Sequence, residues 1–138
     1  MSERIFADTN LFIRIFAKDD PKQLNHVLAL LRRAERGEFT LVTNVPVIAE
    51  IVWVMEGKGS SRDVVRDSIW ALLNTKGVQV DHPNLVGQAI DIYARKNIDF
   101  IDAYSICWMQ ANGITTAYTF DRRHFSRVAG IDVKVPGK

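Results

Sequence analysis

Along the chain, short apolar runs typical of strands alternate with longer segments whose apolar residues recur every three or four positions, as in helices. Short β-prone runs at residues 5–7, 40–43 and 78–80 are typical of strands, and the segments after them carry apolar residues three and four positions apart, as amphipathic helices do. The pattern predicts helices at residues 10–18, 21–37, 44–55, 62–74, 83–95 and 101–112, a helical turn around residue 125, and further strands at residues 116–120 and 133–135.

The predicted helices begin and end at residues suited to those positions. Pro21 and Pro46 favour first helical turns, and Gly37 and Gly113 suit the left-handed conformation that closes a helix. Strands separated by helices imply a parallel sheet covered on both faces, because neighbouring parallel strands need crossover connections. The sequence therefore predicts an α/β fold, in which ligands bind beyond the carboxyl ends of the strands.

Length and composition are those of one globular domain. The chain has 138 residues, and we expect a single domain over residues 1–138, because domains usually span roughly 100–200 residues. Hydrophobic residues make up 47% and charged residues 25%, which excludes disordered and collagen-like chains. The formal net charge of +2 is too small to indicate nucleic-acid binding by itself, so such a function must come from local residues.

The cysteine content and the longest apolar stretch bear on the compartment. Cys107 is the single cysteine, which excludes an internal disulfide and a thiolate zinc site and suits a reducing compartment. The stretch at residues 45–55 contains Glu50 and is shorter than the ~18 residues of a membrane span. We therefore expect a cytoplasmic protein without a membrane segment.

Acidic residues directly follow two of the predicted strands. Asp8 comes after residues 5–7 and Asp121 comes after residues 116–120, so both carboxylates are expected at the carboxyl edge of the sheet. The alternative for each is an N-cap of the following helix. Asp99 and Asp102 flank the start of another helix and are expected at the same edge, the alternative being a capping box.

Glu50 lies in a predicted helix, and its neighbours three and four positions away are apolar: Pro46, Val47, Trp53 and Val54. A carboxylate buried on such a face must be paired, protonated or metal-bound, because burying an unpaired charge destabilises the fold. The alternative to a metal site here is a salt bridge to an arginine from another element.

Carboxylates gathered from distant parts of the chain repel each other and raise one another's pKa unless cations bind among them. Oxygen ligands suit Mg²⁺ or Mn²⁺, and one or two such ions activate water against a phosphodiester. We therefore expect one or two of these ions as the cofactor. The histidines lack mutual ligand spacing and are expected on solvated surfaces or at helix ends: His26, His82 and His124.

Four short motifs occur in order along nearly the whole chain. They are Phe-Ala-Asp-Thr-Asn at residues 6–10, Glu50, Asp-Phe-Ile-Asp-Ala at residues 99–103, and Thr-Phe-Asp at residues 119–121. Together they resemble those of the PIN-domain ribonuclease family. The length and layout are similar to the toxin halves of VapBC-type toxin–antitoxin pairs.

The resemblance implies a three-layer α/β/α sandwich with a short, mostly parallel central sheet, and metal-dependent endonucleolytic cleavage of RNA. It also implies a homodimer and an antitoxin whose C-terminal segment lies across the active-site groove. The acidic metal-binding quartet it implies is Asp8, Glu50, Asp102 and Asp121, with Asp99 as a further acidic contributor and Thr9, Asn10 and Thr119 as supporting residues. Metal-activated water attacking in line predicts 5′-phosphate and 3′-hydroxyl ends.

Basic residues near Asp8 and Asp121 in the sequence are the candidate RNA contacts, with a solvated surface as the alternative. These residues are Arg14, Arg122, Arg123 and His124. Trp53 and Trp70 are expected either in the core or at a subunit interface.

Three other functions remain open from the sequence. A haloacid-dehalogenase-type phosphatase would need a second aspartate where Asn10 stands, two residues after Asp8. A non-catalytic protein-binding module would keep the fold without the chemistry. An RNA-processing nuclease of the same family would act without an antitoxin.

Overall fold

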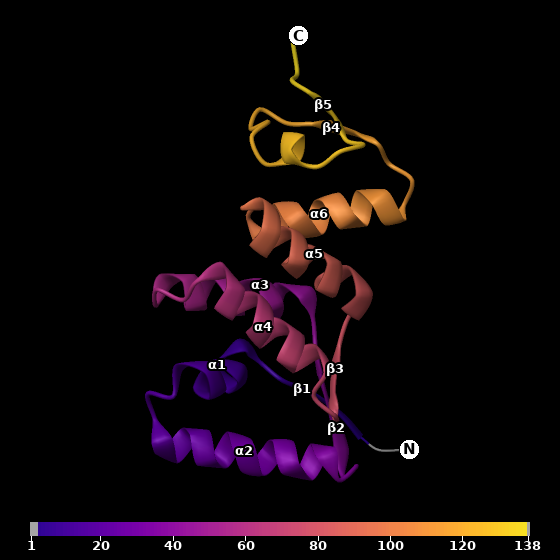
Figure 1. The fold of residues 1–138 in the computed structure, drawn as a ribbon. Helices are drawn as coiled ribbons and strands as arrows, with labels where there is room; N and C mark the ends of the chain where they lie inside the picture. Colours follow the sequence, from indigo (N-terminus) through magenta and orange to yellow (C-terminus); the bar gives the residue numbers. More distant parts are fainter. Residues whose placement is uncertain (1–2, 138) are drawn as a thin grey trace. The chain divides into compact units, whose positions relative to one another are not determined.

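Short strands and amphipathic helices alternate along residues 3–137, the part of the chain that the computed structural model describes (Figure 1). The chain forms two compact units, one ending at Pro83 and the other beginning at Asn84, and each has its own parallel strand pairing. The single domain expected over residues 1–138 stays a prediction, and its ends at residues 1–2 and 138 lie outside the described residues.

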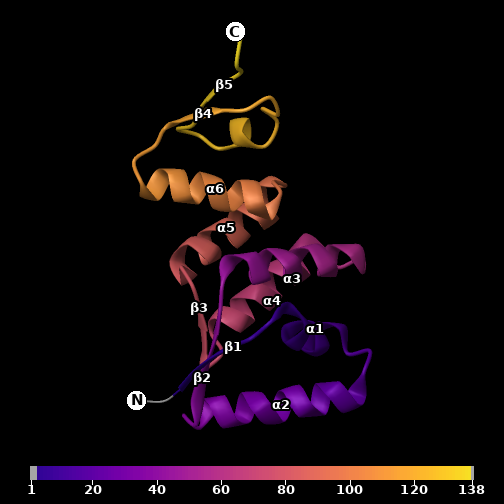
Figure 2. The same ribbon diagram turned by 180° about the vertical axis from the view of Figure 1, so that it is seen from behind.

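The first unit is built on a parallel sheet with the strand order β1-β2-β3. Ile5 of β1 lies opposite Leu41 of β2, which lies opposite Val78 of β3. The strands are β1 (Glu3–Phe6), β2 (Phe39–Thr43) and β3 (Val78–Val80), and the helices are α1 (Thr9–Ala17), α2 (Pro21–Glu35), α3 (Val45–Gly57) and α4 (Arg62–Leu73). Helix α2 runs beside β2, and Figure 2 shows the same elements from behind.

The buried residues of this unit recur at the strand and helix spacings that the sequence shows. Alternate residues of β2 are buried, namely Phe39, Leu41 and Thr43, because successive side chains of a strand point to opposite faces. Helix α3 buries Ile48 and Ile51 completely. Burying an aliphatic side chain of this size contributes about 1.5–3 kcal/mol, so this face of α3 anchors the helix in the unit.

The second unit contains two longer helices, a 3₁₀ turn and a pair of parallel strands. Its most deeply buried side chains include Tyr93 and Ile106. The elements are α5 (Pro83–Lys96), α6 (Phe100–Ala111), β4 (Thr116–Tyr118), η1 (Phe125–Arg127) and β5 (Asp132–Lys134).

The predicted α/β fold with short parallel strands is confirmed, and every predicted helix and strand is present to within two residues of its bounds. The hydrophobic spacing carries this information because it records which side of each element is buried. None of the helices within residues 3–137 has the length and apolar character that a bilayer crossing requires.

Gly77 sits where two parts of the first unit approach closely. Its φ is +89°, and a Cβ built there would lie 2.6 Å from the carbonyl carbon of Ala34 in α2. Its carbonyl oxygen accepts a hydrogen bond from the amide of Leu41 at 2.9 Å. Only glycine suits this position without strain, because it combines a left-handed backbone with contact against another backbone.

We expect Gly77→Ala to lower the free energy of unfolding by about 2–5 kcal/mol, since the left-handed strain and the overlap with Ala34 add together. Gly37→Ala is the control, because Gly37 has a φ of +85° but open space around its Cβ position. Gly37→Ala should lower the free energy of unfolding by only about 1–2 kcal/mol. Urea unfolding measures both, and equal losses would contradict the steric argument.

Candidate functional site

The predicted acidic residues fall into both units. Asp8 and Glu50 belong to the first unit, whereas Asp99, Asp102 and Asp121 belong to the second. The structure describes the surroundings of each group separately. The convergence of all of them at one edge stays a prediction.

Asp8 is placed by hydrogen bonds between β1 and β2. The amide of Ala7 donates to the carbonyl oxygen of Val42 at 2.8 Å, and the carbonyl oxygen of Ala7 accepts from the buried hydroxyl of Thr43 at 3.0 Å. Both polar groups of the residue before Asp8 are therefore held by β2. Asp8 follows at the start of α1, and its side chain is exposed.

The N-cap alternative is wrong for Asp8, and the side chain of Asp99 behaves in the same way. Both residues occupy N-cap positions, of α1 and α6, but neither side chain makes a capping hydrogen bond. The side chains at three other helix starts do accept from the first turn, namely those of Asp20, Asn44 and Ser61. The capping box predicted as the alternative for Asp99 and Asp102 is therefore also absent.

Glu50 is exposed, so the expectation of a buried carboxylate is wrong. Glu50 lies at the edge of the buried face of α3, because Val47, three positions before it, is buried, whereas Trp53, three positions after it, is 76% exposed. The alternative salt bridge to an arginine is not among the ion pairs of residues 3–137. Glu50 Oε2 instead accepts a hydrogen bond from Thr9 Oγ1 at 3.0 Å, and Thr9 is only 5% exposed.

In the second unit, Asp99, Asp102 and His124 form a compact group of possible ligands. One ligand atom from each lies within 4.8 Å of the others. His124 Nδ1 lies 2.7 Å from Asp102 Oδ2 and 3.7 Å from Asp99 Oδ2. Of the two positions expected for His124, the solvated surface is wrong, since the residue is 7% exposed, whereas the helix end is correct, since it precedes the 3₁₀ turn η1. No sequence spacing indicates this grouping, because Asp102 and His124 are separated by a helix, a strand and a turn.

Asp121 lies in a turn that Thr119 closes. Thr119 Oγ1 accepts from the amide of Asp121 at 3.0 Å and donates to its carbonyl oxygen at 3.1 Å. Asp121 Oδ1 accepts from the amide of Arg123 at 3.1 Å, so this carboxylate caps a turn and not a helix. The carboxylate is exposed and keeps an oxygen, Oδ2, which lies 3.8 Å from the guanidinium of Arg123.

The candidate RNA contacts differ in their surroundings. Arg14 pairs with Asp19 at 2.8 Å and lines a cavity of about 450 Å³ together with Asn10 and residues of α2. Arg122 is exposed next to Asp121. His124 is buried beside carboxylates, which favours a role within the acidic group over contact with RNA.

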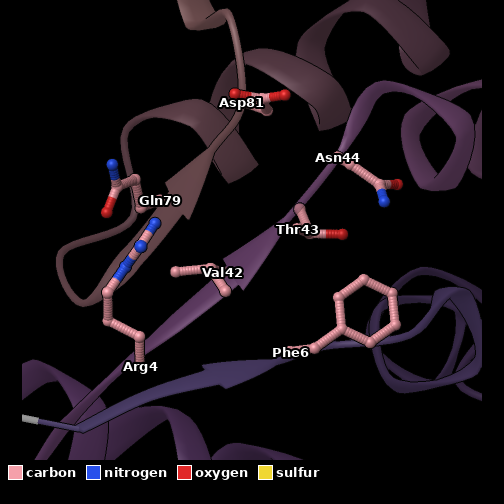
Figure 3. A pocket seen from close by; sticks show the side chains of 7 residues that line it. All are labelled: Arg4, Phe6, Val42, Thr43, Asn44, Gln79 and Asp81. Carbon is pink, nitrogen blue, oxygen red and sulfur yellow. The ribbon is translucent and has the colours of Figure 1, made fainter.

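A second cavity, of about 220 Å³, lies over the sheet of the first unit and reaches the carboxyl ends of its strands (Figure 3). Its lining includes Arg4, Phe6, Gln79 and Asp81. Sequence reasoning missed Asp81, although the signal is the one that identified Asp8. Asp81 directly follows the strand β3, just as Asp8 follows the β-prone run at the start of the chain.

The donor set suits a divalent ion, and the buried cysteine outside it is a poor nucleophile. Carboxylate oxygens are the ligands that Mg²⁺ prefers, and an imidazole nitrogen is also accepted by Mn²⁺. Cys107 is buried, and its burial raises the pKa of the thiol. The thiolate needed for nucleophilic attack is therefore disfavoured at neutral pH.

Comparison with known proteins supports the family but not the subtype of the resemblance. The family model described as PIN domain matches residues 5–131. The curated proteins include no match to the sequence. The helices and parallel strands described above are consistent with the three-layer α/β/α fold of that family.

The difference between capping and non-capping aspartates predicts a difference in stability. Asp20→Ala should lower the free energy of unfolding by about 1 kcal/mol, because the amide of Gln23 loses its acceptor. Asp99→Ala removes no capping bond and should change it by less than about 0.5 kcal/mol. Urea unfolding in the presence of a chelator measures both. A loss at Asp99 equal to that at Asp20 would restore the capping role.

Proposed function

Because the chain belongs to the PIN domain family, whose members are generally metal-dependent nucleases, we propose that it is a divalent-metal-dependent endoribonuclease. The observation that carries the proposal is the state of the acidic side chains. Asp8 and Asp99 stand at helix N-termini without capping them, and Asp99 and Asp102 lie within 4.8 Å of His124. Carboxylates left exposed in this way suit a cation better than a structural role.

The proposed metal ligands are Asp8, Glu50, Asp102 and Asp121, with Asp99 as a further contributor. One or two Mg²⁺ or Mn²⁺ ions held by them would neutralise charge on the scissile phosphate and lower the pKa of a bound water. Thr9 holds Glu50 through Oε2, which leaves Oε1 to accept a proton from water or to bind a cation. Thr119 holds the turn that carries Asp121. The proposed products carry 5′-phosphate and 3′-hydroxyl ends.

We further propose that the enzyme is the toxin of a type II toxin–antitoxin pair acting on cytoplasmic RNA. The order and spacing of its motifs support this role. A homodimer and an antitoxin both need apolar contact surface, and Trp53 and Trp70 supply it, because they are 76% and 37% exposed.

Asp8→Asn should abolish metal-dependent cleavage of end-labelled RNA while leaving the fold intact. Losing a direct ligand should exceed the roughly 10- to 100-fold cost that is typical of outer contacts. The control is Asp20→Asn, because asparagine caps a helix as well as aspartate does and Asp20 serves only α2. Cleavage is compared with Mg²⁺, with Mn²⁺ and with a chelator.

Retained cleavage by pure Asp8→Asn protein would refute the ligand assignment. A wild-type chain that binds neither Mg²⁺ nor Mn²⁺ would support the non-catalytic protein-binding module instead. Activity without a neighbouring antitoxin gene would favour the RNA-processing nuclease over the toxin.

Arg122 is the proposed RNA contact whose test is simplest, because it is exposed beside Asp121. If it neutralises one phosphate, Arg122→Ala should reduce the slope of log affinity against log salt by about 0.7. Fluorescence anisotropy of labelled single-stranded RNA in chelator measures the slope without cleavage. Arg36→Ala is the control, since Arg36 donates to Glu38 at 2.8 Å, and an equal effect of both variants would remove Arg122 from the site.

A further inference from the structure

His124 stands out among the buried polar side chains. Within residues 3–137, those side chains are Thr9, Thr43 and His124, and the two threonines hold Glu50 and the carbonyl oxygen of Ala7. His124 likewise contacts a carboxylate of the acidic group. A buried imidazole needs a hydrogen-bond partner, so this contact is part of how the second unit folds.

The distances show which carboxylate is hydrogen-bonded to the imidazole of His124. Nδ1 lies 2.7 Å from Asp102 Oδ2, within hydrogen-bond range, and 3.7 Å from Asp99 Oδ2, outside it. In the tautomer that carries its hydrogen on Nδ1, the imidazole donates to Asp102 Oδ2, because an ionised carboxylate can only accept. Among residues 3–137 the structure shows no hydrogen-bond donor to the other carboxylate oxygen of Asp102, Oδ1.

The backbone around His124 is fixed relative to α6. The carbonyl oxygen of His124 accepts from the amide of Arg127 at 3.1 Å in the 3₁₀ turn η1. The guanidinium of Arg127 donates to the carbonyl oxygen of Asn97, two residues before Asp99. The segment that carries the imidazole is therefore tied to the segment that carries both carboxylates.

We propose that His124 is a positioning residue that holds the Asp102 carboxylate, through Nδ1 and Oδ2, in the orientation in which Oδ1 binds the divalent ion. The proposal rests on the proposed function, because it presumes that Asp102 is a ligand. A hydrogen-bonded carboxylate loses its rotational freedom before the ion arrives, so less free energy is lost when the ion binds.

The test compares Mn²⁺ affinity of three variants without RNA. His124→Phe keeps an aromatic ring but has no donor. His124→Asn places an amide N–H close to the position of Nδ1, whereas His124→Gln places it close to that of Nε2. Titration calorimetry should show affinity about 10- to 100-fold weaker for His124→Phe and His124→Gln, and close to wild type for His124→Asn. Thermal unfolding in chelator checks that each variant is folded.

The outcomes separate this inference from the proposed function. Wild-type affinity in folded His124→Phe, or equal weakening in His124→Phe and His124→Asn, overturns the positioning role while the wild-type chain still binds Mn²⁺ and cleaves RNA. A wild-type chain that binds no Mn²⁺ overturns both.

A second measurement on the wild-type chain does not depend on any variant folding. Pulsed electron paramagnetic resonance of bound Mn²⁺ detects the strong ¹⁴N coupling of a directly coordinated imidazole. Its absence is expected if His124 acts through Asp102. Its presence would make His124 a ligand and overturn the proposal.

Discussion

The parallel pairing of β1 with β2 is the constraint on which the first half of the candidate site depends. In a parallel ladder the carboxyl ends of neighbouring strands lie together, and here β2 bonds both polar groups of Ala7. The amide of Asp81 donates to the carbonyl oxygen of Thr43 at 3.0 Å, so the turn after β3 is held at the same edge. A slip of one residue in this register would turn the side chains of β1 to the opposite face. The position of Asp8 thus depends on strand register as much as on its own identity.

In the second unit, a helix start and a buried histidine position the acidic residues. No strand register places Asp99 and Asp102, which share the first turn of α6. The buried imidazole of His124, from a later segment, lies 2.7 Å from a carboxylate oxygen of one of them, Asp102. The carboxylates of the two units therefore have different hydrogen-bonding partners. Glu50 is held by a hydroxyl from α1, whereas Asp102 is held by a buried imidazole.

The elements of the fold could be predicted from the sequence because hydrophobic spacing and local capping chemistry determine them. Asn44 and Pro46 marked the start of α3 through interactions that span a single turn. The exposure of Glu50 could not be predicted in the same way, because the pattern does not say that the neighbouring Trp53 is exposed. The burial of His124 beside Asp102 was also hidden, since it joins residues 22 positions apart. The positions of carboxylates after strands could be read locally, but the partners of those carboxylates are set by tertiary packing.

The missing side-chain caps at the starts of α1 and α6 lower the free energy of unfolding that these helices could otherwise contribute. A side-chain cap contributes about 1 kcal/mol, and α2, α3 and α4 each have one. Asp8 and Asp99 stand at N-cap positions that lack this bond, although aspartate is among the best capping residues. The first turns of α1 and α6 therefore lack the stabilisation that a side-chain cap supplies, and both carboxylates remain exposed to solvent.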